Sequence, residues 1–247
     1  MRKILFDHIA IALPRMADAP AVLVGQLGGA PHHGGSSAAY RFGQWSFKGG
    51  GRLEILEPKG EDGFLRRFLE QRGPGVHHVT FTVPSLSEAC DRARAHGYQV
   101  VGYDDSDPGW SEAFLHPRQA LGIVVQFAES KSQDGEGGRR LWQPPPGPPS
   151  PPAPVTILGL RMRARTRDRA RTQWELVLQG QPSLGPAGEL VYDWPGSPMR
   201  LAVEIDPGRD EGPIAIEYAS GRPVTLPEGP HPVLGAVFSR STLSDRA

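Results

Sequence analysis

The chain contains very little cysteine and no long apolar run. Its single cysteine, Cys90, allows no internal disulfide, which fits a reducing cytoplasm, where we expect the protein. The longest apolar runs span only a few residues, far short of the roughly 20 that cross a bilayer. Asp7 and His8 interrupt the apolar N-terminal stretch and no small-residue cleavage site follows, so we expect neither a signal peptide nor a membrane span.

An excess of either charge is also missing. The 247 residues carry 27 Lys and Arg against 27 Asp and Glu, so nothing draws the protein electrostatically to nucleic acid or to an anionic membrane. Hydrophobic residues make up 38% of the chain, which is enough for a packed core. These observations favour a globular protein whose partner is a small molecule.

Proline and glycine are concentrated in one segment. Residues 129–140 are polar and glycine-rich, and they lead into the sequence WQPPPGPPSPPAP. Such a segment cannot form a helix or a central strand, so we predict an extended linker over residues 131–154. It separates a domain over residues 1–130 from a second one over 155–247. A proline-rich ligand for the aromatic groove of another protein is the functional alternative.

The order strand, helix, strand, strand, strand is predicted three times along the chain. The first two units cover residues 1–70 and 75–130, and the third begins at residue 155. In the second unit, Ser85 and Glu88 form a capping box, and the helix ends near Gly97. Cys90 lies in this helix, where we expect a small packing residue and not a nucleophile. The three units are expected to end on the apolar-polar-apolar segments 53–55, 125–127 and 216–218.

Matched polar residues stand in the first and last strands of the first two units. His8 and Glu54 are separated by 46 positions, and His78 and Gln126 by 48. A single strand histidine is more often a hydrogen-bonded core residue, and a single strand glutamate is often solvated. Because the positions match in two repeats, however, we expect the four side chains to meet. Strand alternation places His77 on the opposite face from His78.

Four segments resemble one known family: DHIAIAL, RLEILEP, GPGVHHVTFTV and FLHPRQALGIVVQF are similar to the glyoxalase/bleomycin resistance/dioxygenase (vicinal oxygen chelate) superfamily. Within it they are most similar to the methylmalonyl-CoA epimerases. The resemblance implies an α+β fold in which paired βαβββ modules form a curved mixed sheet, here with a third βαβββ-like module. It also implies one divalent metal ion, cobalt, manganese, zinc, nickel or iron, bound by His8, Glu54, His78 and Gln126.

The sequence departs from the epimerase pattern in two ways. The epimerases read His-Gln-His-Glu in chain order, whereas this chain reads His8, Glu54, His78, Gln126, so carboxylate and carboxamide are exchanged between the modules. Epimerases also resemble one another in an extra glutamate early in the third strand, and the segment SSAAYRFGQWSF contains no acid. Glu54 is therefore the only carboxylate at a ligand position, and we predict it to be the catalytic base.

These observations predict a metal-dependent epimerase, isomerase or lyase that acts on a small carbonyl or acyl-thioester substrate through an enolate-like intermediate. A non-haem iron extradiol-type dioxygenase is the second possibility, because two histidines and one carboxylate form the facial triad of such enzymes. A metal-free ligand-binding or resistance protein is the third. An interaction module built on the linker and the third unit is a further class. An unpaired third module would leave its sheet face and edges uncovered, so we expect it to pack on a second copy of the chain, as a homodimer, or on the first domain.

Several other residues have ordinary structural interpretations. At the position of His8 and His78 the third unit has Gly159, so we predict no metal there. His32 and His33 are expected in a solvated loop, and His116 in a turn. Arg66, Arg67 and Arg72 are predicted to lie on a solvated helix face, with binding of an anionic substrate as the alternative. Gly49–Gly51 predicts a turn, since no helix follows to bind a phosphate.

Overall fold

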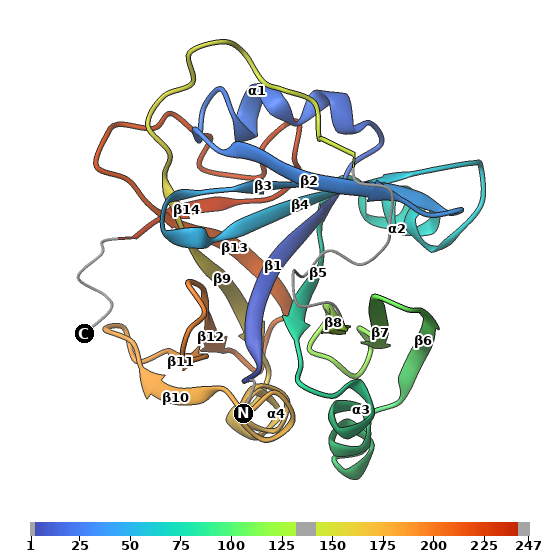
Figure 1. The fold of residues 1–247 in the computed structure, drawn as a ribbon. Helices are drawn as coiled ribbons and strands as arrows, with labels where there is room; N and C mark the ends of the chain where they lie inside the picture. Colours follow the sequence, from blue (N-terminus) through green and yellow to red (C-terminus); the bar gives the residue numbers. More distant parts are fainter. Residues whose placement is uncertain (1–2, 132–141, 242–247) are drawn as a thin grey trace. The chain divides into compact units, whose positions relative to one another are not determined.

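The computed structural model describes residues 3–131 and 142–241, which form two mixed sheets with short helices (Figure 1). The strands of the eight-stranded sheet are, in spatial order, β2 (Ala30–Ser36), β3 (Tyr40–Ser46), β4 (Arg52–Pro58), β1 (Leu5–Ala12), β5 (Gly75–Thr82), β8 (Val124–Ser130), β7 (Trp110–Leu115) and β6 (Val100–Asp107). Those of the six-stranded sheet are β10 (Gln181–Leu184), β11 (Leu190–Asp193), β12 (Arg200–Ile205), β9 (Thr156–Ala164), β13 (Gly212–Ala219) and β14 (Phe238–Arg240).

The repeated pairing of first and last strands confirms the predicted α+β fold of βαβββ modules. In each module the last strand runs parallel to the first: β4 to β1, β8 to β5 and β12 to β9. The strands between them pair antiparallel, as β3 does with β4 and β7 with β8. A parallel pair needs a long crossover connection, which the helix and hairpin of each module supply. The helices are α1 (Pro20–Leu23), α2 (Phe64–Arg72), α3 (Leu86–Ala95) and α4 (Arg167–Arg171), which continues into a π-helical turn, Thr172–Val177.

The third module ends one strand earlier than the sequence predicted. Its last strand is β12, in parallel register with β9, and not the segment GPIAIEYA. That segment is β13, which neighbours β9 in the sheet and pairs with β14 in parallel. The sequence pattern matches Glu217, the polar residue of the segment 216–218, with Glu54 and Gln126, and this match is therefore wrong. The residue at their register position is Ala202, which lies opposite Arg161 two residues after Gly159. β13 and β14 form a further, shortened repeat.

The second module agrees with its prediction in detail. Ser85 Oγ accepts a hydrogen bond from the Glu88 backbone N–H at 3.3 Å, which confirms Ser85 as the N-cap of α3. The helix ends at Ala95, and Gly97 follows with a φ of +83°, a conformation that favours glycine. Cys90 is completely buried on the inner face of this helix, as its interpretation as a packing residue requires.

Three expectations for the first module are wrong. The polar and apolar pattern of residues 18–27 predicts a helix with Asp18 as its cap, but the segment forms only the short helix α1, whose N-cap is Ala19. The predicted loop around His32 and His33 is the strand β2, which pairs with β3 across a register shift. The sequence also predicts two extended segments over residues 38–43 and 44–49, and these are the single strand β3. Local propensity failed here because the segment APHHGGS, weak in β-formers, is a strand only through its pairing with β3.

The proline-rich segment contains neither helix nor named strand over residues 143–155, as predicted. It nevertheless contacts the first module: Trp142 forms an isolated bridge with Gly34, and Val155 N–H donates to Leu27 O at 3.0 Å. The preceding polar stretch, 132–141, lies outside the described residues. The domain boundaries inferred from the sequence remain a prediction.

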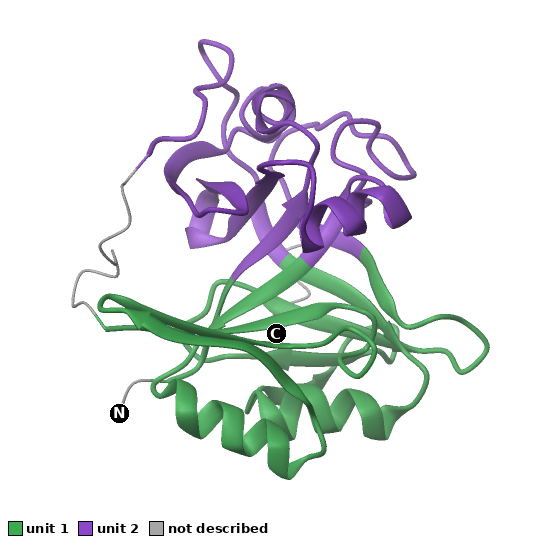
Figure 2. Ribbon diagram, turned by 90° about the vertical axis from the view of Figure 1, so that its right-hand side faces the viewer, with its two compact units in different colours: residues 1–7, 78–138, 159–214 green, residues 8–77, 139–158, 215–247 purple. Residues whose placement is uncertain are grey.

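The backbone divides into two compact units, coloured separately in Figure 2. Unit 1 comprises residues 1–7, 78–138 and 159–214, and its core stacks Phe6 on Phe81 with ring centroids 4.9 Å apart. Unit 2 comprises residues 8–77, 139–158 and 215–247. Part of its core packs Ala10 and Leu56 of the sheet against Leu65 of α2.

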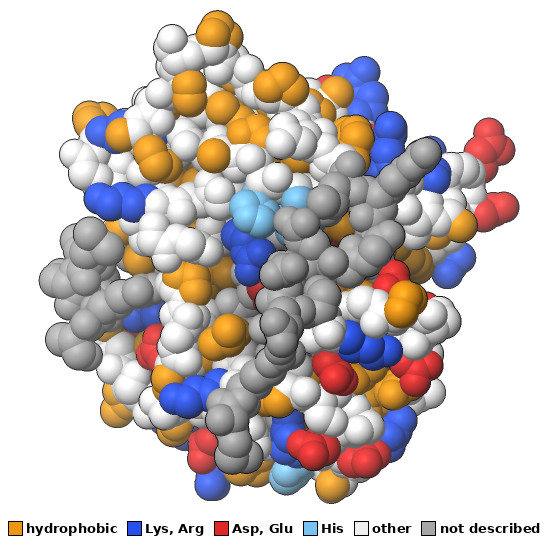
Figure 3. Space-filling view, viewed as in Figure 1, with side chains coloured by type: hydrophobic (Ala, Val, Ile, Leu, Met, Phe, Trp, Pro, Cys, Tyr) orange, Lys and Arg blue, Asp and Glu red, His pale blue; other side chains and the backbone are white. Residues whose placement is uncertain are grey.

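The described residues include no helix long and apolar enough to cross a membrane. On the face drawn in Figure 3, basic and acidic side chains are interspersed and do not gather into a patch of one sign. This distribution agrees with the balanced composition of the chain.

Candidate metal centre

The first module brings His8 and Glu54 onto one buried face. Ala10 and Glu54 are register partners in the parallel pair β1–β4, and His8 lies two residues before Ala10. Residues two apart on a strand point to the same side, so both side chains share a face. His8 Nε2 lies 3.5 Å from Glu54 Oε2, and the two side chains are only 4% and 7% exposed.

Gln44 on the neighbouring strand β3 supports both residues. It is the register partner of Glu54, and its Nε2 donates to Glu54 Oε2 at 2.9 Å. The same nitrogen lies 3.3 Å from His8 Nδ1, so the other ring nitrogen, Nε2, is the one that faces Glu54. The carbonyl oxygen of Gln44 is buried and has no hydrogen-bond partner among the described residues. No sequence pattern points to Gln44, because its place opposite Glu54 depends on the register of β3 with β4.

The second module repeats this arrangement with His78 and Gln126. Thr80 is the register partner of Gln126 and lies two residues after His78, so the three side chains share a face. Thr80 Oγ1 donates to Gln126 Oε1 at 2.6 Å. The amide nitrogen of Gln126 donates to Glu112 Oε2 on β7 at 2.9 Å. Glu112 was not among the candidates from the sequence.

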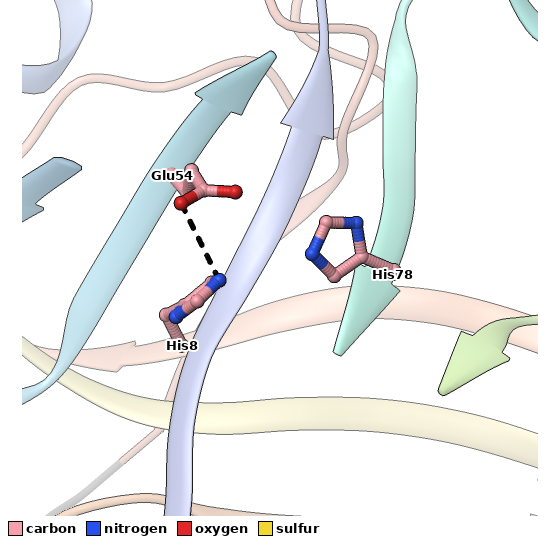
Figure 4. A group of neighbouring side chains, drawn as sticks. All are labelled: His8, Glu54 and His78. Carbon is pink, nitrogen blue, oxygen red and sulfur yellow. Dashed lines mark ion pairs between the residues drawn. The ribbon is translucent and has the colours of Figure 1, made fainter. Parts of the chain in front are cut away.

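The three ionisable residues of the predicted set come together (Figure 4). His8, Glu54 and His78 are all buried, and one ligand atom of each lies within 4.8 Å of the others. Two imidazoles and a carboxylate are a donor set for zinc, iron, cobalt, nickel or manganese, whose bonds to such atoms are roughly 2.0–2.2 Å long. These residues therefore fit a single divalent ion.

The other histidines of this region differ in their surroundings. His77 faces α2, where its ring lies 4.9 Å from the ring of Phe68, and burial lowers its pKa to about 4, although Glu54 opposes this. His33 on β2 is half-buried. Burial and then the neighbouring His32 lower its pKa, while the charge of Glu54 raises it. The Nδ1 atoms of His32 and His33 are 2.6 Å apart. His33 therefore lies within electrostatic reach of Glu54.

The remaining candidates take the places that the sequence indicated. His116 begins an exposed turn in which its Nδ1 accepts from the Arg118 N–H at 3.2 Å. Arg66, Arg67 and Arg72 lie on α2, and Arg66 Nε donates to Gly60 O at 3.0 Å. Residues 48–50 form a single helical turn between β3 and β4.

Comparison with known proteins gives one family. A family model described as the glyoxalase/bleomycin resistance protein/dioxygenase superfamily matches residues 7–114. The uncharacterized protein YqjC of Bacillus subtilis is 31% identical over 131 residues, which are 51% of this chain and 91% of that protein. An ethylmalonyl-CoA/methylmalonyl-CoA epimerase of Cereibacter sphaeroides is 29% identical over 134 residues, 50% of this chain and 96% of the relative.

A solved structure resembles more of the chain. A variant of 4-hydroxymandelate synthase from Streptomyces coelicolor superposes with a TM-score of 0.63 over 89% of this chain and 72% of its own, at 12% sequence identity. This likeness concerns the fold alone. It covers a larger share of the chain than the family model, which matches residues 7–114.

Proposed function

Because the chain belongs to the glyoxalase/bleomycin resistance protein/dioxygenase superfamily, we propose that it is a divalent-metal-dependent epimerase, isomerase or lyase. Its substrate is a small carbonyl compound or acyl thioester that reacts through an enolate-like intermediate. The observation that carries the proposal is the buried cluster of His8, Glu54 and His78, whose ligand atoms lie within 4.8 Å of one another. Gln126 completes the ligand set as a neutral oxygen donor.

A divalent ion held by these residues supplies Lewis-acid chemistry: it polarises a carbonyl and stabilises the charge of an enolate. The residues of the chain perform the other tasks. Glu54 is the carboxylate that removes the proton α to the carbonyl, because position 126 holds a carboxamide, which does not accept a proton near neutral pH. Gln44 holds the Glu54 carboxylate by its hydrogen bond to Oε2. The sheet face that carries His8 and Glu54 is buried, which keeps water from the reacting proton.

The similarity to the epimerase of Cereibacter sphaeroides supports this class of reaction. The exchange of carboxylate and carboxamide between the modules argues against methylmalonyl-CoA itself as the substrate, since the base then stands in the other module. A small acyl compound with an acidic α-proton is the substrate class that this arrangement serves.

A dioxygenase is the second candidate, favoured by the donor set of two histidines and one carboxylate. In that case Glu54 remains a fixed ligand throughout the reaction. A ligand-binding protein without metal is the third candidate, and it predicts a purified chain that holds no stoichiometric metal.

The test begins with elemental analysis of the purified full chain. The metal-loaded protein is then incubated in D₂O with acyl thioesters and 2-oxo compounds, and α-deuterium incorporation is followed by NMR. We expect exchange that depends on the metal. Dioxygen uptake with a catechol and ferrous iron, without any exchange, would instead support the dioxygenase.

A further inference from the structure

The face of the second module that carries His78 also carries a carboxylate outside the predicted ligand set. Glu112 on β7 is the register partner of Ala128, and Phe114, two residues later, is the partner of Gln126. Register partners and residues two apart share a face. Glu112 therefore lies on the same side of the sheet as Gln126 and His78.

Hydrogen bonds on both sides of the Gln126 carboxamide fix its orientation. A carboxylate only accepts hydrogen bonds, so the amide nitrogen of Gln126 must be the atom that faces Glu112 Oε2, 2.9 Å away. The amide oxygen then faces Thr80, whose hydroxyl donates to it at 2.6 Å. Trp110 Nε1 donates to the same Glu112 oxygen at 2.9 Å and holds the carboxylate in place. A carboxamide oxygen has two lone pairs, and the bond from Thr80 uses one of them.

Glu112 also gives a physical reason for a carboxamide at position 126. A glutamate there would bring a second carboxylate within hydrogen-bond distance of Glu112, and two like charges so close are mutually destabilising. The first module has the complementary arrangement, in which the carboxamide of Gln44 donates to the carboxylate of Glu54. Each module thus holds one carboxylate paired with one carboxamide, in opposite order.

We propose that Glu112 is a positioning residue which, together with Thr80, holds Gln126 with its amide oxygen presented as the neutral donor of the metal site. This inference rests on the proposed function, because it needs a divalent ion at His8, Glu54 and His78. Partners that orient metal ligands in this way typically contribute about 10- to 100-fold to metal affinity.

The test uses the full chain and Co²⁺ alone, with affinity from titration and ligand geometry from the visible absorption of the bound ion. Glu112→Ala should weaken Co²⁺ binding about tenfold and change the spectrum. Glu112→Gln should stay close to wild type, because its amide oxygen still accepts from Gln126. Thr80→Val, which removes the hydrogen bond from Thr80 to the Gln126 oxygen, should weaken Co²⁺ binding as well.

Asp105→Ala controls for the loss of one negative charge, because Asp105 is an exposed acid on β6. Thermal unfolding checks that each variant folds.

The decisive comparison is between the Gln126→Ala chain and the double variant Gln126→Ala, Glu112→Ala. The added Glu112→Ala should have no further effect on the affinity for Co²⁺. An unchanged affinity and spectrum in Glu112→Ala would overturn the inference, and so would a loss that persists in the Gln126→Ala background. If His78→Ala abolishes Co²⁺ binding while Glu112→Ala does nothing, only the role of Glu112 falls. If the wild-type chain binds no Co²⁺, the proposed metal site fails and the inference fails with it.

Discussion

In the eight-stranded sheet, β1 and β4 carry His8 and Glu54 two register positions apart, and β5 and β8 carry His78 and Gln126 in the same relation. In the six-stranded sheet, the equivalent positions on β9 and β12 hold Gly159 and Ala202. Neither residue has a side chain that binds metal. The two sheets thus share a strand order around the central pair but differ at the positions where chemistry is expected.

The backbone explains part of this difference. Gly159 has a φ of +145°, a conformation that L side chains rarely adopt. A Cβ at this position would lie 1.8 Å from the backbone oxygen of Arg200, its register partner on β12. The strands are too close here for any side chain, so no histidine can take the place that His8 and His78 occupy. The comparison teaches that a repeated scaffold can exclude a ligand by backbone geometry.

The largest expected effect concerns the metal ion proposed for the eight-stranded sheet. Replacing His8 or His78 with Ala removes one of two imidazole donors, and a site built on three ionisable ligands should then lose tight binding while the chain still folds. Elemental analysis should show about one divalent ion per chain in the wild type and almost none in either variant. His116→Ala, in the exposed turn that follows β7, should keep full occupancy. Full metal occupancy in both the His8→Ala and the His78→Ala chain would contradict a metal site in the eight-stranded sheet.

The next largest effect concerns the difference between the two modules of the eight-stranded sheet, one with Glu54 and the other with Gln126. Glu54→Gln keeps an oxygen donor at the ligand position but removes the base, so the metal should stay while α-proton exchange slows by at least about 100-fold. Gln126→Glu adds a carboxylate beside Glu112 and leaves Glu54 in place, so exchange should continue, with a lower melting temperature. Deuterium exchange and thermal unfolding measure the two results. Persistent exchange in the Glu54→Gln chain would assign the proton to another group.

The sequence was sufficient to predict the modules and the strands that carry His8, Glu54, His78 and Gln126, because spacing and alternation are local properties. The prediction failed for strands whose formation depends on pairing with a neighbouring strand. The strand β2 is rich in glycine and has weak β-propensity, and β10 is a short, fully exposed edge strand, so neither left a clear pattern. Because the sequence pattern does not reveal β10, it predicts β13 as the last strand of the third module. The Ile-Glu-Tyr segment of β13 resembles the ends of the other two modules.

The residues that support the candidate site could not be predicted from the sequence either. Gln44 and Glu112 matter because they lie beside Glu54 and Gln126, and that neighbourhood depends on the register of β3 with β4 and of β7 with β8. A one-residue shift in either register would place them on the opposite face. The homodimer expected from the sequence also remains a prediction.

A smaller effect tests the backbone argument for the second sheet. Gly159→Ala should destabilise the chain by about 3 kcal/mol, because the new Cβ meets the Arg200 carbonyl and the residue is held at a positive φ. Gly221→Ala is the matched control, since a Cβ there meets nothing within 4 Å. Chemical denaturation of both variants gives the difference. If Gly159→Ala unfolds like the wild type, the close approach of β9 and β12 does not explain the missing ligand.

The smallest effect concerns the shortened repeat of the second sheet. Between β13 and β14 no named helix or strand occurs, and His231 is a buried side chain of this connection, 5% exposed. Its Nδ1 accepts from the Val233 N–H at 3.1 Å, which requires the unprotonated nitrogen. Burial lowers its pKa below the ordinary value of 6.5, so the folded state binds fewer protons than the unfolded state in mild acid. The stability that this residue contributes is therefore complete above pH 6.5 and is lost as the pH falls toward the folded-state pKa.

His231→Asn keeps an oxygen that can accept from Val233 but does not titrate. Its stability should match the wild type at pH 8 and fall less steeply as the pH is lowered below 6.5, as measured by urea denaturation at a series of pH values. Equal slopes for the two proteins would show that the stability of the connection does not depend on a neutral His231.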